Sequence, residues 1–202
     1  MKKSDFFANH DPRIIPILQN SIVGIAGCGG LGSNAAFTLT RVGIGKLIFA
    51  DFDKIEPSNL NRQQFFIDQI GYYKADALKA NLSKISTFTE FEAYNIKLTE
   101  ANIPEIFKDA DIMVEAFDKA EMKEMLIDCW LEHFPQKPII AASGLAGWGR
   151  NELLKTRKLE NLYICGDEQT ELQSGISPMA PRVGIVANMQ VNLVLEILLK
   201  DL

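Results

Sequence analysis

GIAGCGGLGSN, residues 24–34, decides the fold of this chain. Gly27, Gly29 and Gly32 match the pattern G-x-G-x-x-G, and Gly30 adds a glycine at its fourth position. An apolar run leads into this turn and a helical pattern leaves it, which is the context that a phosphate-binding turn requires. Glycines let phosphate approach the backbone, and the helix N-terminus offers unpaired N–H groups and a partial positive charge. The stretch predicts a nucleotide-phosphate site without specifying the nucleotide; a turn that serves only strand–helix packing is the alternative.

Strand and helix patterns alternate along the rest of the chain. Short apolar runs predict buried strands, and apolar residues at helical spacing predict helices. We expect strands at 21–27, 46–51, 91–97, 111–117 and 138–144. We expect helices at 30–43, at 72–86, within 101–110, at 119–134 and at 182–202.

The pattern changes near the C-terminal end, where two short strands, 152–156 and 162–165, suggest a hairpin. The expected fold class is therefore α/β: a doubly wound, mostly parallel, Rossmann-like sheet with a C-terminal antiparallel extension and a closing helix. Because no linker divides the chain, we expect one domain, 1–202, with an N-terminal arm (1–20) and a crossover-type loop (166–181).

Composition argues against several classes of protein. The chain has 202 residues, 47% of them apolar, and a net charge of -5, so it does not suggest a nucleic-acid-binding protein. No apolar run follows the first lysines, so we expect no secretory signal. The most apolar stretch, 183–199, is interrupted by Asn, Gln and Glu, which favours a buried helix over a membrane span. Three widely spaced cysteines without a CxxC pair fit a reducing cytoplasm and lack the usual spacing of a zinc site.

The stretch DFDKIEPSNLNRQQF, residues 51–65, follows the second expected strand. Asp51 ends that strand, 19 residues after Gly32. At this distance from the glycine turn a carboxylate can accept hydrogen bonds from ribose hydroxyls. A solvated Asp at a strand end is the alternative, and the nearby glycine turn favours the ribose.

The same loop carries more polar residues than a dinucleotide needs. They are Asp53, Glu56, Ser58, Asn59, Asn61, Arg62 and Gln63. Arg62 and Lys74, which lies at the start of the next expected helix, could both turn back toward the glycine turn and neutralise phosphate charge. A dehydrogenase that binds NAD holds only a diphosphate, so this cluster favours a triphosphate.

Several stretches together carry a family resemblance. They are GIAGCGGLGSN (24–34), DFDKIEPSNLNRQ (51–63), GYYKADAL (71–78), VEAFDKAEMK (114–123) and SPMAPRVGIVANMQVNLVLEIL (177–198). They resemble the ThiF/MoeB adenylyltransferases, relatives of the ubiquitin-activating enzymes. The string S-N-L-N-R-Q is the most specific part. The short length resembles the compact ThiF-like subgroup in particular.

The resemblance implies an ATP-dependent adenylyltransferase. The C-terminal glycine carboxylate of a small ubiquitin-like sulfur carrier would attack the α-phosphate of ATP, forming an acyl-adenylate and releasing pyrophosphate. The implied partner is a carrier ending in Gly-Gly, namely the one that feeds thiamine thiazole synthesis. Mg²⁺ is the implied metal, and a homodimer is the implied assembly. Neither nucleic acid nor a membrane is expected as a partner. Because a carboxylate is already a nucleophile, the protein has only to bring anions together and stabilise growing charge.

The resemblance also assigns roles to residues. Asp51 would bind ribose, and Asn59, Arg62 and Lys74 would hold the triphosphate. Asp118, at the end of the fourth strand, would hold or orient magnesium; capping the N-terminus of helix 119–134 is its alternative. The implied nucleotide-binding residues are Gly27, Gly29, Gly30, Gly32, Asp51, Asp53, Asn59, Arg62 and Lys74. The implied catalytic residues are Arg62, Lys74 and Asp118.

The chain departs from the family pattern in places. Many relatives carry two CxxC pairs for structural zinc, where this chain has only Cys165, so no zinc is expected. Cys165 is also the one nearby candidate for sulfur transfer, but the end of an apolar strand favours a buried structural thiol. Relatives contact ATP with an N-terminal Arg of the partner subunit; Arg13 could do so or be solvated. Arg182 and Trp148 could lie near the carrier tail or serve only the structure.

Two other functions remain open from the residues. An NAD-dependent oxidoreductase would need a catalytic acid or base beyond the glycine turn, and the two histidines lie in the N-terminal arm and at a helix end. A non-catalytic nucleotide-binding partner subunit would not need Arg62, Lys74 and Asp118 together.

Overall fold

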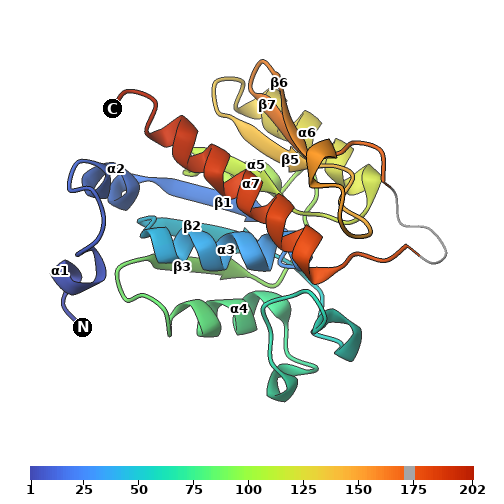
Figure 1. The fold of residues 1–202 in the computed structure, drawn as a ribbon, viewed down its shortest axis with the longest axis horizontal. Helices are drawn as coiled ribbons and strands as arrows, with labels where there is room; N and C mark the ends of the chain where they lie inside the picture. The colour runs from blue at the N-terminus through green and yellow to red at the C-terminus, as the bar shows by residue number, and fades with distance from the viewer. Residues whose placement is uncertain (171–175) are drawn as a thin grey trace.

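The computed structural model describes residues 1–170 and 176–202, and a seven-stranded sheet forms its centre (Figure 1). The strands are β1 (Ile22–Ala26), β2 (Lys46–Ala50), β3 (Glu90–Tyr94), β4 (Ile112–Glu115), β5 (Ile139–Ala142), β6 (Lys155–Leu159) and β7 (Leu162–Gly166). Their order is β3-β2-β1-β4-β5-β7-β6, and β6 runs antiparallel to β7 while the other neighbours are parallel. The expected fold class is confirmed.

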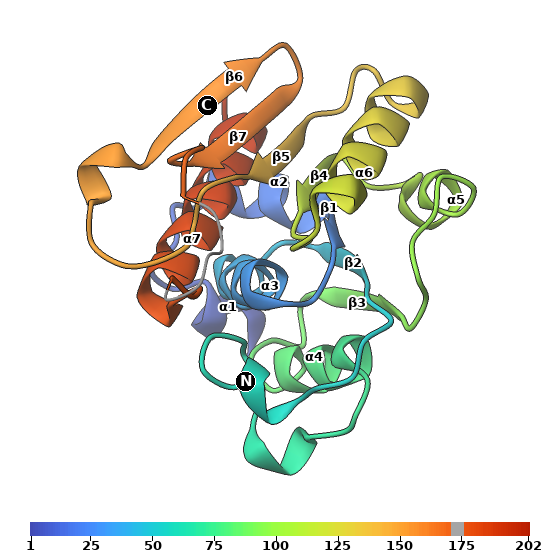
Figure 2. The same cartoon turned by 90° about the vertical axis from the view of Figure 1, so that its right-hand side faces the viewer.

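Helices cover both faces of this sheet. They are α1 (Lys3–Phe6), α2 (Ile14–Asn20), α3 (Gly30–Val42), α4 (Lys74–Leu82), α5 (Ile103–Phe107), α6 (Ala120–His133) and α7 (Ala180–Leu198), with one-turn 3₁₀ helices η1 (Pro57–Asn59), η2 (Ile67–Gln69) and η3 (Asn151–Leu153). Helices α3, α4 and α7 pack on one face, and α5 and α6 pack on the other (Figure 2).

Two hydrophobic cores follow from the alternation of side chains along the strands. Val23 and Ile25 of β1 point into the core shared with α3 and α7, whereas Ala26 points into the core shared with α5 and α6. The second core includes Trp130, which is fully buried. A strand buried on both faces explains why the sequence reads as a continuous apolar run.

The hairpin was expected to begin at 152–156, and that position is wrong. Strand β6 spans Lys155–Leu159, and the residues just before it form η3. All five residues of β6 are exposed, because it is the edge strand of the sheet. An exposed, charged edge strand shows no alternation of apolar and polar residues. The expected strand was therefore placed over the two leucines at 153 and 154, before the strand that the structure shows.

The N-terminal arm is helical and lies at the amino end of the strands (Figure 1). Phe7 is buried against Gly43, where an added Cβ would come within 2.3 Å of its ring. Residues 171–175 of the expected crossover-type loop lie outside the described residues. No helix in the described part of the chain has the length and apolarity that a membrane crossing needs.

Candidate functional site

A cavity of about 440 Å³ opens at the carboxyl ends of β1, β2 and β4. Strands β1 and β4 are neighbours in the sheet. From β1 the chain continues to β2 on one side, and from β4 it continues to β5 on the other side. An open α/β sheet binds ligands at such a point, and the cavity lies there. Eight of the residues singled out from the sequence line it: Gly27, Gly29, Gly30, Asp51, Asp53, Arg62, Lys74 and Asp118. Gly32 and Asn59 do not line it.

The glycine turn has the backbone geometry that its glycines allow. Gly27 has a φ of 98°, and an added Cβ would lie 2.9 Å from the carbonyl oxygen of Ala116, which directly follows the neighbouring strand β4. A Cβ on Gly32 would lie only 1.9 Å from the carbonyl oxygen of Gly27. Gly32 therefore lets α3 pack closely on β1, which is a structural contribution to the turn.

The first turn of α3 faces the cavity with unpaired N–H groups. Among the described residues, the N–H groups of Gly29, Gly30 and Leu31 find no protein acceptor. All three residues line the cavity. Unpaired N–H groups at a helix N-terminus form an anion site, and they suit phosphate oxygens.

Asp51 is built into the floor of the site. Its carboxylate accepts hydrogen bonds from the N–H groups of Cys28, at 2.7 Å, and Asp53, at 2.8 Å. Burial raises the pKa of Asp51, while Lys74 and the two N–H donors act in the opposite direction. The carboxylate thus fixes the turn and the loop, and it still lines the cavity, where the ribose contact stays a prediction.

Lys74 and Asp53 form an ion pair at the cavity wall. Lys74 Nζ lies 2.7 Å from Asp53 Oδ2, and the N–H group of Lys74 donates to the carbonyl of Asp53 at 2.9 Å. The side chain of Lys74 is 8% exposed, whereas that of Asp53 is 50% exposed. Asp53 therefore holds a nearly buried cation beside the glycine turn.

Arg62 and Asn59 lie on the same loop, but only Arg62 lines the cavity. The guanidinium of Arg62 donates to the carbonyl of Ser58 at 3.1 Å and to Asn61 Oδ1 at 2.8 Å, and it lines the cavity. Asn59 is buried and turned away, with its Oδ1 accepting from the N–H group of Glu56 at 3.0 Å. Its position supports the loop that carries Arg62, and a direct triphosphate contact by Asn59 stays a prediction.

Asp118 is exposed in the segment between β4 and α6 and lines the cavity. The alternative that it caps α6 is wrong, because Lys119 occupies the cap position and no side chain caps it. Among the described residues, the Asp118 carboxylate accepts no hydrogen bond and forms no ion pair. It is therefore available to a ligand or a metal.

Sequence reasoning missed the buried support of this segment. Glu115 is fully buried, and its carboxylate accepts from Lys123 Nζ at 2.8 Å and from the N–H group of Phe117 at 2.6 Å. Burial raises the pKa of Glu115, and the Lys123 ammonium acts in the opposite direction. From the other side, Gln190 of α7 donates to the carbonyl of Glu115 at 2.9 Å. The sequence did contain a signal for this ion pair: the acidic Glu115 lies inside an apolar strand, and Lys123 lies on the helix that follows.

Further residues that line the cavity were given no role at the site from the sequence. They are Leu31, Ala50, Phe52, Gln63, Ile96, Lys97, Leu98, Ala116, Phe117, Lys119, Glu121, Met122 and Pro178. Residues 96–98 follow β3, so their place at the carboxyl edge of the sheet could have indicated them. Ile96, Leu98, Phe117 and Met122 give the cavity an apolar wall.

The three thiols are free and buried. Burial raises the pKa of the Cys165 thiol to about 11, although the Thr156 hydroxyl, at 3.9 Å, acts in the opposite direction. Burial also raises the pKa of the Cys28 and Cys129 thiols. The thiolate, which is the nucleophile, is therefore scarce at neutral pH.

We expect the native protein to show no rapidly reacting thiol with a thiol-specific disulfide reagent at pH 8. With a pKa near 11, Cys165 is a thiolate in only about one molecule in a thousand. In guanidinium chloride all three thiols should react. A single fast thiol that disappears in Cys165→Ser would contradict this result and restore a catalytic role for Cys165.

Arg13, Arg182 and Trp148 lie outside the cavity lining. Arg13 is exposed in the N-terminal arm and pairs with Asp11 at 2.6 Å. Trp148 is 72% exposed. Arg182 is buried, donating to Asp167 Oδ2 at 2.5 Å and to the carbonyl of Gly149, so its structural interpretation is favoured.

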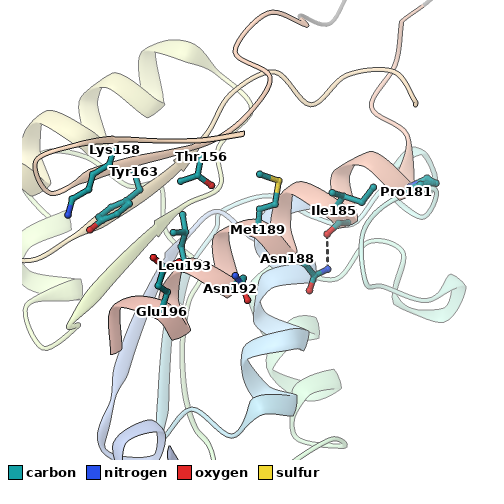
Figure 3. A pocket seen from close by; sticks show the side chains of 11 residues that line it. Thr156, Lys158, Tyr163, Pro181, Ile185, Asn188, Met189, Asn192, Leu193 and Glu196 are labelled. Atoms are coloured by element: carbon teal, nitrogen blue, oxygen red, sulfur yellow. Dashed lines mark hydrogen bonds between the residues drawn. The ribbon is translucent and has the colours of Figure 1, made fainter. Parts of the chain in front are cut away.

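A second hollow, of about 990 Å³, lies between the β6–β7 hairpin and α7 (Figure 3). Side chains of the hairpin, such as Tyr163, face side chains of α7, such as Met189 and Leu193. Its lining is mostly apolar or neutral, with Lys158 and Glu196 as the charged members. The lining of this larger hollow lacks the unpaired N–H groups and clustered cations that phosphates need. The cavity at the glycine turn, although it is smaller, is therefore the candidate nucleotide site.

Comparison with known proteins decides the family. The family model described as "ThiF family" matches residues 13–201, which is nearly the whole chain. The chain belongs to the ThiF family. Its glycine turn, the loop with Arg62 and Lys74, and the segment ending in Asp118 all lie within that match.

Curated relatives of this ThiF-family chain are longer proteins. The adenylyltransferase and sulfurtransferase UBA4 of Scheffersomyces stipitis is 31% identical over 149 residues, covering 73% of this chain and 33% of that protein. The ubiquitin-like modifier-activating enzyme 5 of Drosophila sechellia is 46% identical over 82 residues, covering 41% of this chain and 20% of that protein. The chain thus spans about a third or less of these relatives.

A solved structure of similar size supports the fold. The E. coli tRNA N6-threonylcarbamoyladenosine dehydratase TcdA, in complex with AMP, superposes with a TM-score of 0.87. The superposition covers 98% of this chain and 93% of that chain, at 16% sequence identity. At 16% identity, this structural similarity is evidence for the fold of the ThiF-family chain alone.

Proposed function

We propose that this ThiF-family chain adenylates the C-terminal glycine carboxylate of a small ubiquitin-like sulfur carrier, with ATP as the second substrate and pyrophosphate as the product. The observation that carries the proposal is the cavity, where unpaired N–H groups of the glycine turn, Arg62, Lys74 and the unpaired carboxylate of Asp118 converge. The family match and the names of the relatives support it.

The residues divide the work by chemistry. Unpaired N–H groups of Gly29 and Gly30 are directed donors for phosphate oxygens, and Arg62 and Lys74 offset the phosphate charge. The apolar wall, including Ile96 and Leu98, suits the flat face of a base. The attacking carboxylate needs no proton removed, so charge stabilisation by these fixed groups is the main contribution to the rate.

Magnesium fits the chemistry of the site. Magnesium is usually held by one or two carboxylates together with substrate phosphates, and Asp118 offers one unpaired carboxylate at the cavity. When bound, the ion would neutralise charge that develops on the phosphates. Among the described residues no group of three or more His, Cys, Asp or Glu side chains gathers to hold a metal without substrate.

We extend the proposal to a homodimer in which Arg13 of a second copy approaches the nucleotide. Arg13 lies in the arm at the amino end of the strands, so it cannot serve the cavity of its own chain. Large apolar side chains are exposed on the segment between Arg62 and Lys74, including Phe66, Ile67 and Tyr72, which supports a protein contact there. We place the reaction in the cytoplasm, where the three free thiols would stay reduced, and in thiamine thiazole synthesis, for which the match to the ThiF family is the support.

ATP–pyrophosphate exchange tests the proposed function. We expect labelled pyrophosphate to enter ATP in the presence of Mg²⁺ and a ubiquitin-like carrier ending in Gly-Gly. The same carrier without its last glycine should support no exchange, because the carboxylate then lies out of reach. Carriers of thiamine synthesis and of other pathways, compared side by side, test the assignment to a pathway.

Two outcomes would overturn this function. Saturable ATP binding without exchange for any carrier would indicate a non-catalytic partner subunit. Tight NAD binding without ATP binding would indicate an oxidoreductase.

A further inference from the structure

Gln63 is held rigidly at the edge of the glycine turn. It is 8% exposed and lines the cavity between Arg62 and the turn. A Cβ added to Gly29 would lie 3.8 Å from Gln63 Nε2, so the amide is a direct neighbour of the turn. The backbone around it is fixed, because its own N–H group donates to the carbonyl of Asn59 at 3.0 Å and that of Gln64 donates to Ser33 Oγ at 3.1 Å.

The side-chain amide of Gln63 lacks a protein partner within the described residues. Its Oε1 is enclosed and accepts no hydrogen bond, and its Nε2 donates none. Neighbouring glutamines differ: Gln64 Nε2 donates to Asn34 Oδ1 at 2.7 Å, and Gln69 exchanges two hydrogen bonds with Asn81. Buried amides are nearly always hydrogen-bonded, because losing water without a replacement costs free energy. The Nε2 donor, which is unused and lies beside the glycine turn, therefore points to an acceptor on a ligand as its partner.

We propose that Gln63 is a phosphate ligand of this site: its Nε2 donates to a phosphate oxygen of the nucleotide seated on the glycine turn. The inference rests on the proposed function, since it takes the cavity as a nucleotide site. Because Oε1 is enclosed, Nε2 is the end of the amide left to face the cavity. Arg62 and Lys74 supply positive charge there, and Gln63 adds a directed donor without adding charge.

The replacement Gln63→Met, which keeps the length and removes the amide, tests this role. Hydrogen bonds to charged groups are worth enough to expect ATP and AMP to bind about 10- to 100-fold more weakly, measured by titration calorimetry. Adenosine, which lacks phosphate, should compete equally well against both proteins. The unliganded variant should unfold at the same temperature or higher, because an unpaired buried acceptor has been removed. A residue with a merely structural role would lower that temperature.

Gln64→Met is the matched control, because it removes the adjacent amide, which bonds Asn34 and does not line the cavity. ATP affinity should stay unchanged in this control. A second variant, Gln63→Glu, keeps the shape and should weaken ATP more than Gln63→Met does, since a carboxylate repels phosphate.

The outcomes separate this inference from the proposed function. If the wild-type chain binds ATP and Gln63→Met binds it equally well, the phosphate role of Gln63 is wrong and the proposed function stands. An equal loss for adenosine would also overturn it, because Gln63 would then contact the nucleoside. If the wild-type chain fails to bind ATP, the proposed function itself fails.

Discussion

Lys74→Met should slow ATP–pyrophosphate exchange by about two to three orders of magnitude, the loss typical of removing one fixed donor from developing charge. The Lys74 side chain is 8% exposed, so its ammonium acts in a poorly solvated wall where its field is weakly screened. Asp53, at 2.7 Å, holds it in place before substrate arrives. The free energy of unfolding should change little, since Asp53 is half-exposed and can be hydrated once its partner is gone.

Lys54→Met is the control for Lys74. Lys54 lies on the same loop, with its Nζ 5.0 Å from the centre of the Tyr73 ring, and it does not line the cavity. Its removal should leave the exchange rate within about twofold, since an exposed charge outside the cavity is screened by solvent and salt. If Lys74→Met kept more than a tenth of the wild-type rate, Lys74 would not stabilise the transition state.

Arg182→Ala should lower the free energy of unfolding by about 3–5 kcal/mol, because it leaves the buried carboxylate of Asp167 unpaired. For a chain of this length the midpoint of thermal unfolding should fall by about 6–20 °C. The guanidinium also binds the carbonyl of Gly149, so the ion pair joins the end of β7, the segment after β5 and the start of α7. Calorimetry or circular dichroism would measure the shift.

Arg157→Ala is the control for this pair. Arg157 also pairs with a carboxylate, that of Glu168 at 2.5 Å, but on the surface, with 45% of its side chain exposed. Its removal should cost at most about 1 kcal/mol, as is usual for exposed ion pairs. Equal losses in the two variants would show that burial of the Arg182 pair contributes nothing.

The pH dependence of stability should separate these variants as well. Burial alone would raise the pKa of Asp167, but N–H donors of Thr170 and Gln169, the Thr170 hydroxyl and Arg182 together lower it. A lowered folded-state pKa means that the contribution is present above the unfolded pKa of about 3.9 and is lost as pH falls below it. The wild-type chain should therefore lose stability in this acid range, and Arg182→Ala should lose less.

The sequence was sufficient for the parts of the site that follow parallel strands. Gly29, Asp51 and Asp118 each come directly after an apolar run, and parallel strands bring their carboxyl ends to one edge. Lys74 could be assigned because it opens the helix that returns from the loop. These residues share the cavity for reasons of topology, which local patterns reveal.

Other features depend on contacts that no local pattern carries. Arg182 looked like a helix-start residue or a tail contact, and its partner Asp167 lies in a different element. Every residue of the edge strand β6 is exposed, so its sequence has no alternation of apolar and polar residues from which its bounds could be predicted. Gln63 was one polar residue among seven in its loop, and only its enclosed Oε1 distinguishes it.

The cavity has walls that belong to different hydrophobic cores. The glycine turn opens α3, which packs on one face of the sheet, whereas Met122 and its neighbours belong to the start of α6 on the other face. A ligand in the cavity therefore touches both layers at once and is bound only when both are folded. We therefore expect a bound nucleotide to stabilise both layers against unfolding, because the complete site exists only when both are folded.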